Sequence, residues 1–480
     1  MSRRYGNPSA FQRLVCCVMG LGLLLGGCTL APRFTRPEAP VPTSWPEGAA
    51  YQESPEAPGA PSAAEIPWRH FFTDAELQKL ITAALENNRD LRLAALNVQR
   101  ARGVYGIQRG ALFPALDATA NGLKQRVPAD LSSSGERRTV EQYDVNLGVF
   151  AWEIDFFGRL RSLKDQALEA FLATEEARRS TQILIVSAVG ETYLALAADR
   201  EALNLAQTTL EAQKATYDLV KRRYEVGLAT QLDLNFAQTQ VDVARRDRAL
   251  YTQRVAQDEN ALNFLVGAPL PVSSDDLPKR LAEISPPRAI ATGIPSDVLL
   301  QRPDILQAEH LLKAANANIG AARAALFPRI SLTTSAGTAS ADLAGLFESG
   351  SGTWLFAPQI VMPIFDTRLW SALDVTKAEK EIALARYEQA IQAAFREVAD
   401  TLAVQGTVDE QLAAQQSLVR ANTATYRLSE ARYLRGVDSY LSVLVAQRSL
   451  FAAQQGLVAL KLSKRANQVR LYAVLGGGAD

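Results

Sequence analysis

Histidine and cysteine are scarce in this chain of 480 residues, which holds two His and three Cys. His70 and His310 stand alone in the sequence, and we expect both to be structural. No spacing of residues is typical of a metal site, a catalytic centre or a phosphate-binding glycine loop. Lys and Arg match Asp and Glu at 51 each, so nothing indicates a nucleic-acid-binding surface. We therefore expect no enzyme, no cofactor and no metal centre.

The first 27 residues have the pattern of a signal peptide. A positive region, formed by Arg3, Arg4 and Arg13, precedes an apolar run at 14–25 that is short for a membrane span. The run ends in Leu25-Gly26-Gly27-Cys28, which resembles the lipobox of bacterial lipoproteins. That resemblance implies cleavage after residue 27 and acylation of Cys28, as in palmitate-bearing lipoproteins. Thr29 favours the outer membrane, and an ordinary signal peptide with an unused cysteine is the alternative.

Glycines mark an internal duplication. Gly227 follows Arg222-Arg223-Tyr224, Gly436 follows Arg432-Tyr433-Leu434-Arg435, and the two glycines are 209 residues apart. At the same offset, a seven-residue apolar period over 189–224 returns over 398–433, which is typical of helices that pack side by side. Glycine readily takes the left-handed conformation that stops a helix. We therefore expect each glycine at the tip of a long helical hairpin.

Between these landmarks, helical and strand patterns alternate twice along the chain. In the first copy we expect a helix from Asp74 to Leu112, a strand pair within 115–157, a long helix at 159–224 and a return helix at 231–265. In the second copy we expect a helix at 304–326, a strand pair within 329–366, a long helix at 369–433 and a return helix ending near Leu475. The fold class is mixed α and β, with mostly long helices and a tandem duplicated unit.

The predicted domains follow from this order. They are a signal peptide at 1–27, a Pro-rich arm at 28–67, a first repeat at 68–267, a connector at 268–296, a second repeat at 297–476 and a tail at 477–480. Four strands of about ten residues with one apolar face suit an outer-membrane barrel, but the smallest such barrels need eight strands. Open sheet edges are not tolerated in lipid, so several chains must combine if these strands enter the membrane. A small soluble sheet on a helical rod is the alternative.

Several segments resemble the TolC-like outer-membrane efflux channels, especially their lipoprotein (OprM/NodT-like) branch. They are Cys28 to Pro32 with Arg36-Pro37, Leu300 to Asp304 with Ala308-Glu309, Ile319-Gly320, Phe327 to Leu332, and Arg432 to Gln447. The resemblance implies a homotrimer in which twelve strands form a barrel in the outer membrane, atop a helical barrel in the periplasm. It also implies two partners, a periplasmic adaptor protein and an inner-membrane pump that is proton-driven.

Candidate site residues cluster at the two hairpin tips. For the aperture of the pore the candidates are Asp233, Asp438, Arg223, Tyr224, Arg432, Tyr433 and Arg435. Rings of the two aspartates would favour cations, and the Arg and Tyr residues are candidates for contacts that hold the aperture shut. For adaptor contact, the resemblance implies Gly227, Leu228, Gly436 and Val437. Solvated charges, helix caps and ordinary packing are the alternatives for these residues. Val445 departs from the family, whose members frequently have an acidic residue at this position, so an acidic ring of the family type is in doubt here.

The resemblance implies a passive conduit that exports drugs or other small toxic compounds, with the energy supplied by the pump. A channel for type I protein secretion has the same architecture and remains an alternative, as does a lipoprotein scaffold that spans the periplasm without a channel. Lipid exposure of Leu147 or Leu332 would favour the barrel over the scaffold.

Overall fold

The computed structural model describes residues 29–51, 63–273, 275–290 and 296–479, so Cys28 and the predicted signal peptide lie outside the described residues. The chain divides into two compact units. Unit 1 consists of Met1–Glu38, Val98–Ala173 and Ala308–Tyr387, and unit 2 of Ala39–Asn97, Thr174–Gln307 and Glu388–Asp480. Each unit takes segments from both predicted repeats, so the repeat boundaries remain a prediction.

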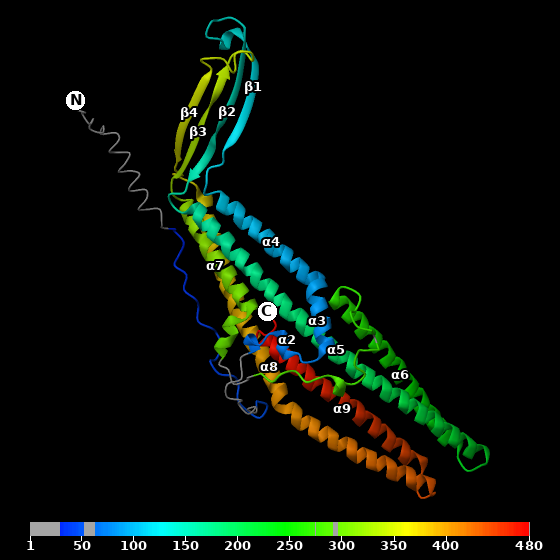
Figure 1. The fold of residues 1–480 in the computed structure, drawn as a ribbon. Helices are drawn as coiled ribbons and strands as arrows, with labels where there is room; N and C mark the ends of the chain where they lie inside the picture. The colour runs from blue at the N-terminus through cyan, green and yellow to red at the C-terminus, as the bar shows by residue number, and fades with distance from the viewer. Residues whose placement is uncertain (1–28, 52–62, 274, 291–295, 480) are drawn as a thin grey trace, which may run out of the picture. The chain divides into compact units, whose positions relative to one another are not determined.

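Unit 1 contains one antiparallel sheet with the strand order β1-β2-β3-β4 (Figure 1). The strands are β1 (Asp117–Val127), β2 (Arg138–Ile154), β3 (Arg329–Ser340) and β4 (Gly352–Val361). Each predicted strand pair forms a hairpin, and the pairing of β2 with β3 joins the two hairpins into one sheet. Within the part of the chain that the structure describes, β1 and β4 each have one edge without a partner strand.

The two faces of the sheet differ in chemistry. Pairing through β3 aligns Leu147 on β2 with Trp354 on β4, and these side chains are 52% and 79% exposed. On the opposite face, Asp144 accepts hydrogen bonds from the side-chain amides of Asn121 and Asn146. At this level of the sheet one face is therefore apolar and open and the other is polar, as in a strand whose side chains alternate between lipid and lumen. Further along β1 and β2, the face of Leu147 carries the ion pair of Lys124 with Glu141.

Two long helical hairpins carry most of the remaining chain. Helix α5 (Arg159–Glu225) turns back into α6 (Gln231–Val266), and α8 (Thr367–Leu434) turns back into α9 (Tyr440–Val474) (Figure 1). At about 1.5 Å per residue, α5 and α8 are each roughly 100 Å long. Helices α5 and α9 are long and apolar enough for a membrane span, but 61% of the apolar window in α5 is buried within the chain. Packing against other helices therefore accounts for the apolar character of α5.

The single helix expected from Asp74 to Leu112 is wrong, because the chain breaks at Asn88 into α3 (Ala75–Asn87) and α4 (Arg89–Gly110). The Asn88 side-chain oxygen accepts hydrogen bonds from the backbone N–H groups of Asp90 and Leu91, at 2.8 and 3.1 Å. Its amide nitrogen donates to the carbonyl of Leu265 at 2.8 Å. Asn88 thus caps α4 and ties it to the end of α6, which compensates for the lost helical hydrogen bonds.

Shorter elements complete the fold: η1 (Ala63–Glu65), α2 (Trp68–Phe71), η2 (Ala129–Leu131), η3 (Leu281–Glu283), η4 (Ser296–Gln301) and α7 (Pro303–Ala324). In the core of unit 2, the ring of Phe71 stacks on Tyr472 with centroids 3.9 Å apart. The hydroxyl of Tyr472 donates to the carbonyl of Ile66 at 2.5 Å, so this buried polar group has a partner. The start of the packed chain and the end of α9 are therefore held together.

The N-terminal arm lies along α7 in unit 1, and the two run in opposite directions. Four contacts hold it: Leu30 with Arg323, Pro32 with Asn316, Phe34 with Lys313, and Arg36 with Glu309. Successive arm residues in this set are two positions apart, whereas the helix residues are spaced more widely. An extended arm from 30 to 36 and a helix from 309 to 323 each span roughly 20 Å, so the contacts stay in register.

Gly320 sets how closely the arm approaches α7. A Cβ atom there would lie 2.7 Å from the backbone nitrogen of Ala31 and 2.6 Å from the Ser162 hydroxyl. We expect Gly320→Leu to lift the arm, because the backbone of Ala31 would have to move. Trypsin should then cleave after Arg33 faster than in the unchanged protein, with the fragments identified by mass spectrometry.

The control is Gly103→Leu, since Gly103 is also helical but has open space around it. An arm that resists trypsin equally in both variants would contradict this account of Gly320.

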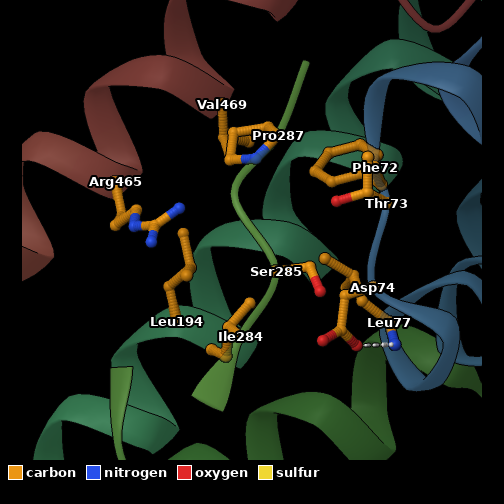
Figure 2. Close-up of a pocket in the computed structure, with 10 residues that line it drawn as sticks. All are labelled: Phe72, Thr73, Asp74, Leu77, Leu194, Ile284, Ser285, Pro287, Arg465 and Val469. Carbon is orange, nitrogen blue, oxygen red and sulfur yellow. Dashed lines mark hydrogen bonds between the residues drawn. The ribbon is translucent and has the colours of Figure 1, made fainter. Parts of the chain in front are cut away.

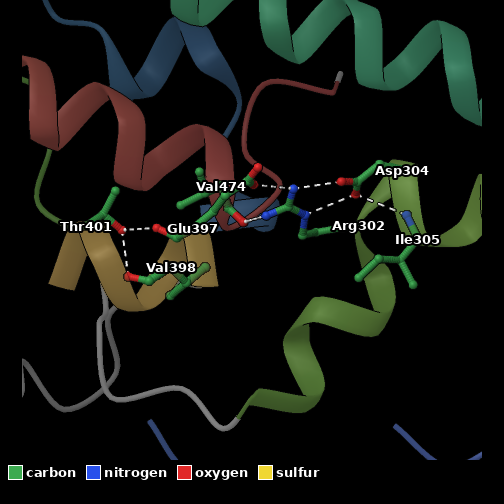
Figure 3. A network of polar contacts seen from close by, with 7 residues as sticks. All are labelled: Arg302, Asp304, Ile305, Glu397, Val398, Thr401 and Val474. Carbon is green, nitrogen blue, oxygen red and sulfur yellow. Dashed lines mark hydrogen bonds and ion pairs between the residues drawn. The ribbon is translucent and has the colours of Figure 1, made fainter. Parts of the chain in front are cut away.

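A buried arginine joins three helices in unit 2 (Figure 3). Arg302, 9% exposed, donates to both carboxylate oxygens of Asp304 at 3.0 and 2.7 Å and to Glu397 at 3.0 Å. It also donates to the carbonyl of Val474 at 2.7 Å. Because Asp304 belongs to α7, Glu397 to α8 and Val474 to α9, one guanidinium links all three. The Arg-Pro-Asp segment of the sequence is thus a packing centre of the fold.

Candidate functional site

The two hairpin tips have the same backbone geometry. Gly227 and Gly436 both have φ +76°, in the left-handed region. The N–H of Gly227 donates to the carbonyl of Tyr224, and the next N–H, of Leu228, donates to the carbonyl of Arg223 at 2.7 Å. The second tip repeats both bonds 209 residues later. This pair of bonds is the Schellman arrangement that ends a helix, and it explains why glycine occupies both positions.

Each of the two candidate aspartates accepts hydrogen bonds from a residue of its own hairpin. Asp233 accepts hydrogen bonds from the backbone N–H and the hydroxyl of Thr230, at 2.9 and 2.8 Å, and so caps α6. Asp438 accepts from two nitrogens of Arg432, at 2.6 and 3.0 Å. These hydrogen bonds hold the pKa of Asp438 below its ordinary value. Asp438 therefore stays ionised at neutral pH, but Arg432 balances its charge.

The tips of the two hairpins touch each other through Arg223 and Tyr433. The Arg223 guanidinium lies 4.9 Å from the centre of the Tyr433 ring, a cation–π contact between α5 and α8. Tyr433 also packs on Tyr440 of α9, with ring centroids 5.3 Å apart. Burial raises the pKa of Tyr433, and Arg223 opposes that rise. Tyr433 is therefore a neutral aromatic surface against which the first tip rests.

A small core lies directly behind this contact. Tyr440 and Val443 of α9 are buried with Val220 of α5 and Ala237 of α6. Tyr224, by contrast, is 40% exposed and lies outside that core, although it continues the apolar period of α5. Arg435 is also exposed. The structure thus brings Arg223, Tyr433, Arg432 and Asp438 into contacts at the tips and leaves Tyr224 and Arg435 on the surface.

The tips also expose an apolar surface that the sequence patterns indicate only in part. Its members, all more than half exposed, are Val226, Leu228, Leu232, Leu434, Val437, Leu441 and Val445. Leu441 and Val445 lie one helical turn apart on α9, on the face opposite the buried Val443. Several exposed apolar side chains at the end of a helical hairpin indicate a protein contact site. The signal in the sequence is an apolar residue directly after each turn glycine, Leu228 and Val437.

Other candidate chemistry is sparse. His310 lies 2.7 Å from Glu169, and this single contact joins α7 to α5. Across the described ranges, no group of three or more His, Cys, Asp or Glu side chains is placed to hold a metal ion. The pocket in Figure 2, between Asp74, Ile284 and Arg465, has a volume of about 10 Å³. That is space for about one water molecule, so this pocket cannot hold a transported compound.

Comparison with known proteins places this arrangement in a family. The family model described as "Outer membrane efflux protein" matches residues 80–268 and 294–477. The chain is 51% identical over 457 residues to the toluene efflux pump outer membrane protein TtgC of Pseudomonas putida, covering 95% of this chain and 93% of the relative. The antibiotic efflux pump outer membrane protein ArpC of Pseudomonas putida gives the same identity and coverage.

A solved structure matches as well. The open state of the Neisseria gonorrhoeae MtrE outer membrane channel superposes with a TM-score of 0.83 at 36% identity. The match covers 94% of this chain and 99% of that one. The long hairpins and the four-stranded sheet are thus the fold of an outer-membrane channel.

Proposed function

This chain belongs to the outer membrane efflux protein family, and we propose that it is the passive outer-membrane conduit of a tripartite efflux system. Three copies assemble around one pore. A periplasmic adaptor docks on the hairpin tips, and a proton-driven pump in the inner membrane supplies the energy. The conduit itself holds no catalytic step.

The open sheet of unit 1 is the observation that carries this proposal. Its edge strands β1 and β4 are 11 and 10 residues long, a length that suits a tilted strand across an outer membrane. Lipid offers no hydrogen bonds to an unpaired edge, so β1 of one copy must pair with β4 of the next. The alternating strand directions make that pairing antiparallel, and three copies close a barrel of twelve strands.

Exposed apolar residues lie just outside the ends of both edge strands. Ile364 and Phe365 follow β4 and are 94% and 89% exposed, while Phe113 and Leu116 precede β1 and are 65% and 66% exposed. Such side chains are costly in water at roughly 25 cal/mol per Å² of apolar surface. The assembly removes this cost, because the β4 side of one copy meets the β1 side of its neighbour and the remaining surface meets lipid.

The course of the arm supports lipid anchoring at Cys28. Leu30 is bound by Arg323, which lies one residue before the end of α7 and six before the start of β3. Cys28 comes two residues before Leu30, so acyl chains on it start near the end of the helices, where the strands begin. Two or more acyl chains would hold the arm stably at the membrane surface.

The cargo proposal comes from the relatives, whose names specify toluene and antibiotics. We propose that this conduit passes drugs and other small toxic compounds. At the tips, Gly227, Leu228, Gly436 and Val437 form the adaptor surface, because their backbone turns outward and their neighbours are apolar and exposed. Of the two candidate carboxylates, Asp233 is the one without an ion pair among the described residues, since Arg432 balances Asp438.

The contact of Arg223 with Tyr433 is expected to hold the aperture closed. A cation–π contact is worth roughly 0.5–1 kcal/mol at an exposed site, so three copies together supply roughly 1.5–3 kcal/mol. If opening breaks all three, Arg223→Ala shifts the closed-to-open equilibrium by roughly tenfold to a hundredfold. Conductance of the purified mature trimer in planar bilayers measures this, with larger or longer openings expected for the variant.

Lys221→Ala is the matched control, because it removes an exposed cation two residues away on the same helix. Equal conductance in all three proteins would discard Arg223 as a closing residue. Silence from well-folded trimers of every variant, with the adaptor added, would count against the conduit itself.

A further inference from the structure

Two carboxyl groups face each other across the first hairpin, about 40 Å from its tip along the helices. Asp199 lies on α5, 3.9 Å from Arg254 of α6, and Asp258 follows Arg254 by one helical turn on the same face of α6. Oxygen Oδ2 of Asp258 is buried and has no hydrogen-bond donor in the described part of the chain. Two ionised carboxylates cannot bond to each other, since both are only acceptors. A proton on one of them would complete the bond and satisfy the buried oxygen.

The ion pairs around these two aspartates do not include Asp258. Three cations and three carboxylates of this layer are paired: Arg254 with Asp199 at 3.9 Å, Lys461 with Glu201 at 3.5 Å, and Arg200 with Glu259 at 2.7 Å. The layer includes α5, α6, α9 and the connector, which contributes the Leu277 carbonyl to Arg200 and the Leu281 N–H to Glu201. Of the four carboxylates named here, Asp258 alone has no ion pair in the described part of the chain.

The second hairpin carries uncharged side chains at the two corresponding positions. At the repeat offset of 209 residues, Val408 corresponds to Asp199 and Asn467 to Asp258. Val408 is buried, and buried Asn467 donates to the carbonyl of Thr401 at 3.0 Å. The helices therefore accept an uncharged, hydrogen-bonded side chain at the position of Asp258, and only the first hairpin carries the acid pair.

We propose that Asp199 and Asp258 form a proton-binding site that ties α6 to α5 when it holds a proton and loosens the first hairpin when it does not. A metal ion is a poor alternative occupant, because hard cations take six or more oxygen ligands and this pair offers two carboxylates. Burial raises the pKa of both groups, and the nearby Asp199 raises that of Asp258 further, to about 6. The site therefore titrates close to neutral pH.

The sign of the effect on stability follows. The folded protein binds this proton more tightly than the unfolded chain does, so the contribution to stability is largest in acid. It is lost as pH rises from about 4 through about 6. Asp258→Asn keeps the shape and supplies a permanent donor, so this variant should lose the dependence on pH in that window.

The first experiment uses the purified full-length trimer and does not depend on transport. Infrared spectra should show a protonated carboxyl band that disappears with a midpoint near pH 6, and this band should be absent from Asp258→Asn. Thermal unfolding should show the variant more stable than the unchanged protein at pH 7.5, and this difference should shrink as pH falls from about 6 to about 4. Asp242→Asn, in an exposed pair with Arg245 on the same helix, is the control and should behave as the unchanged protein.

A band that titrates in the ordinary range of aspartate, or a pH dependence retained in Asp258→Asn, would overturn the proton site. The consequence for gating rests on the proposed function and is tested separately. Bilayer conductance should rise between pH 5.5 and 7.5 in the unchanged protein and stay flat in Asp258→Asn. A titrating band together with conductance that ignores pH would overturn the link to the hairpin while leaving the conduit intact.

Discussion

Replacing Gly227 and Gly436 together by leucine is expected to abolish efflux and to leave the trimer assembled. Both glycines have φ +76°, and a Cβ at either position would meet nothing within 4 Å. The new side chains therefore project into solvent at the tips, where the proposed adaptor docks. A non-glycine residue in this conformation costs roughly 1–2 kcal/mol, which is small and local compared with the packing of helices of this length.

Two measurements separate docking from assembly. Susceptibility of cells to an exported compound should rise to the level of a strain that lacks the protein, while native mass spectrometry should still show trimers. The matched control is the pair Gly135→Leu and Gly350→Leu, whose glycines also have positive φ and open surroundings but lie in the loops between strands. It carries the same backbone strain away from the tips and should retain efflux.

Strain and bulk can be told apart at the tips themselves. The Gly227→Ala and Gly436→Ala pair has the same backbone strain as the leucine pair but a far smaller side chain, so partial efflux is expected. Full resistance in the leucine pair, or equal loss in the loop control, would rule out the tips as the adaptor surface.

Much of the fold could be predicted because the sequence contains an internal duplication, so each pattern occurs twice. The 209-residue offset locates both turn glycines, and the seven-residue period of α5 is carried by residues that are buried in the structure, such as Val189 and Leu196. The strand pairs were visible because their side chains alternate between the two faces of one sheet. The predicted ends of α5, α6 and α8 lie within two residues of the observed ends. The fold class and the family are confirmed.

What the sequence could not give depends on contacts between distant segments. The break at Asn88 is stabilised by Leu265, which is 177 residues away, so a local helical pattern does not reveal it. The proximity of Asp199 to Asp258 could not be predicted without knowing the register between α5 and α6. Asp438 looked like a free carboxylate because its partner, Arg432, is brought to it only by the left-handed turn between them. The roles of the tip residues in closing the pore and binding an adaptor stay predictions.

Arg302→Ala is expected to lower the stability of the helical part strongly. The guanidinium is buried, and its loss leaves Glu397 and the Val474 carbonyl without their bonds to it. Breaking a fully buried ion pair by removing one partner costs roughly 3–5 kcal/mol. The side chains of Asp304 and Glu397 are 37% and 35% exposed, so water solvates them in part and a smaller loss is expected. The unfolding midpoint of the purified protein should therefore fall clearly in thermal melts, and the amount of trimer in membranes should fall with it.

Conservative replacement sharpens this test. Arg302→Lys keeps the positive charge but cannot form the paired bonds to Asp304 while also reaching Val474, so an intermediate loss is expected. Arg245→Ala breaks an exposed pair with Asp242 and should cost only roughly 0.2–1 kcal/mol. Unfolding of Arg302→Ala at the midpoint of Arg245→Ala would contradict the role of this residue. The expected order, with alanine worst at position 302 and lysine between, would show that the Arg-Pro-Asp segment joins α7, α8 and α9 by its geometry as well as its charge.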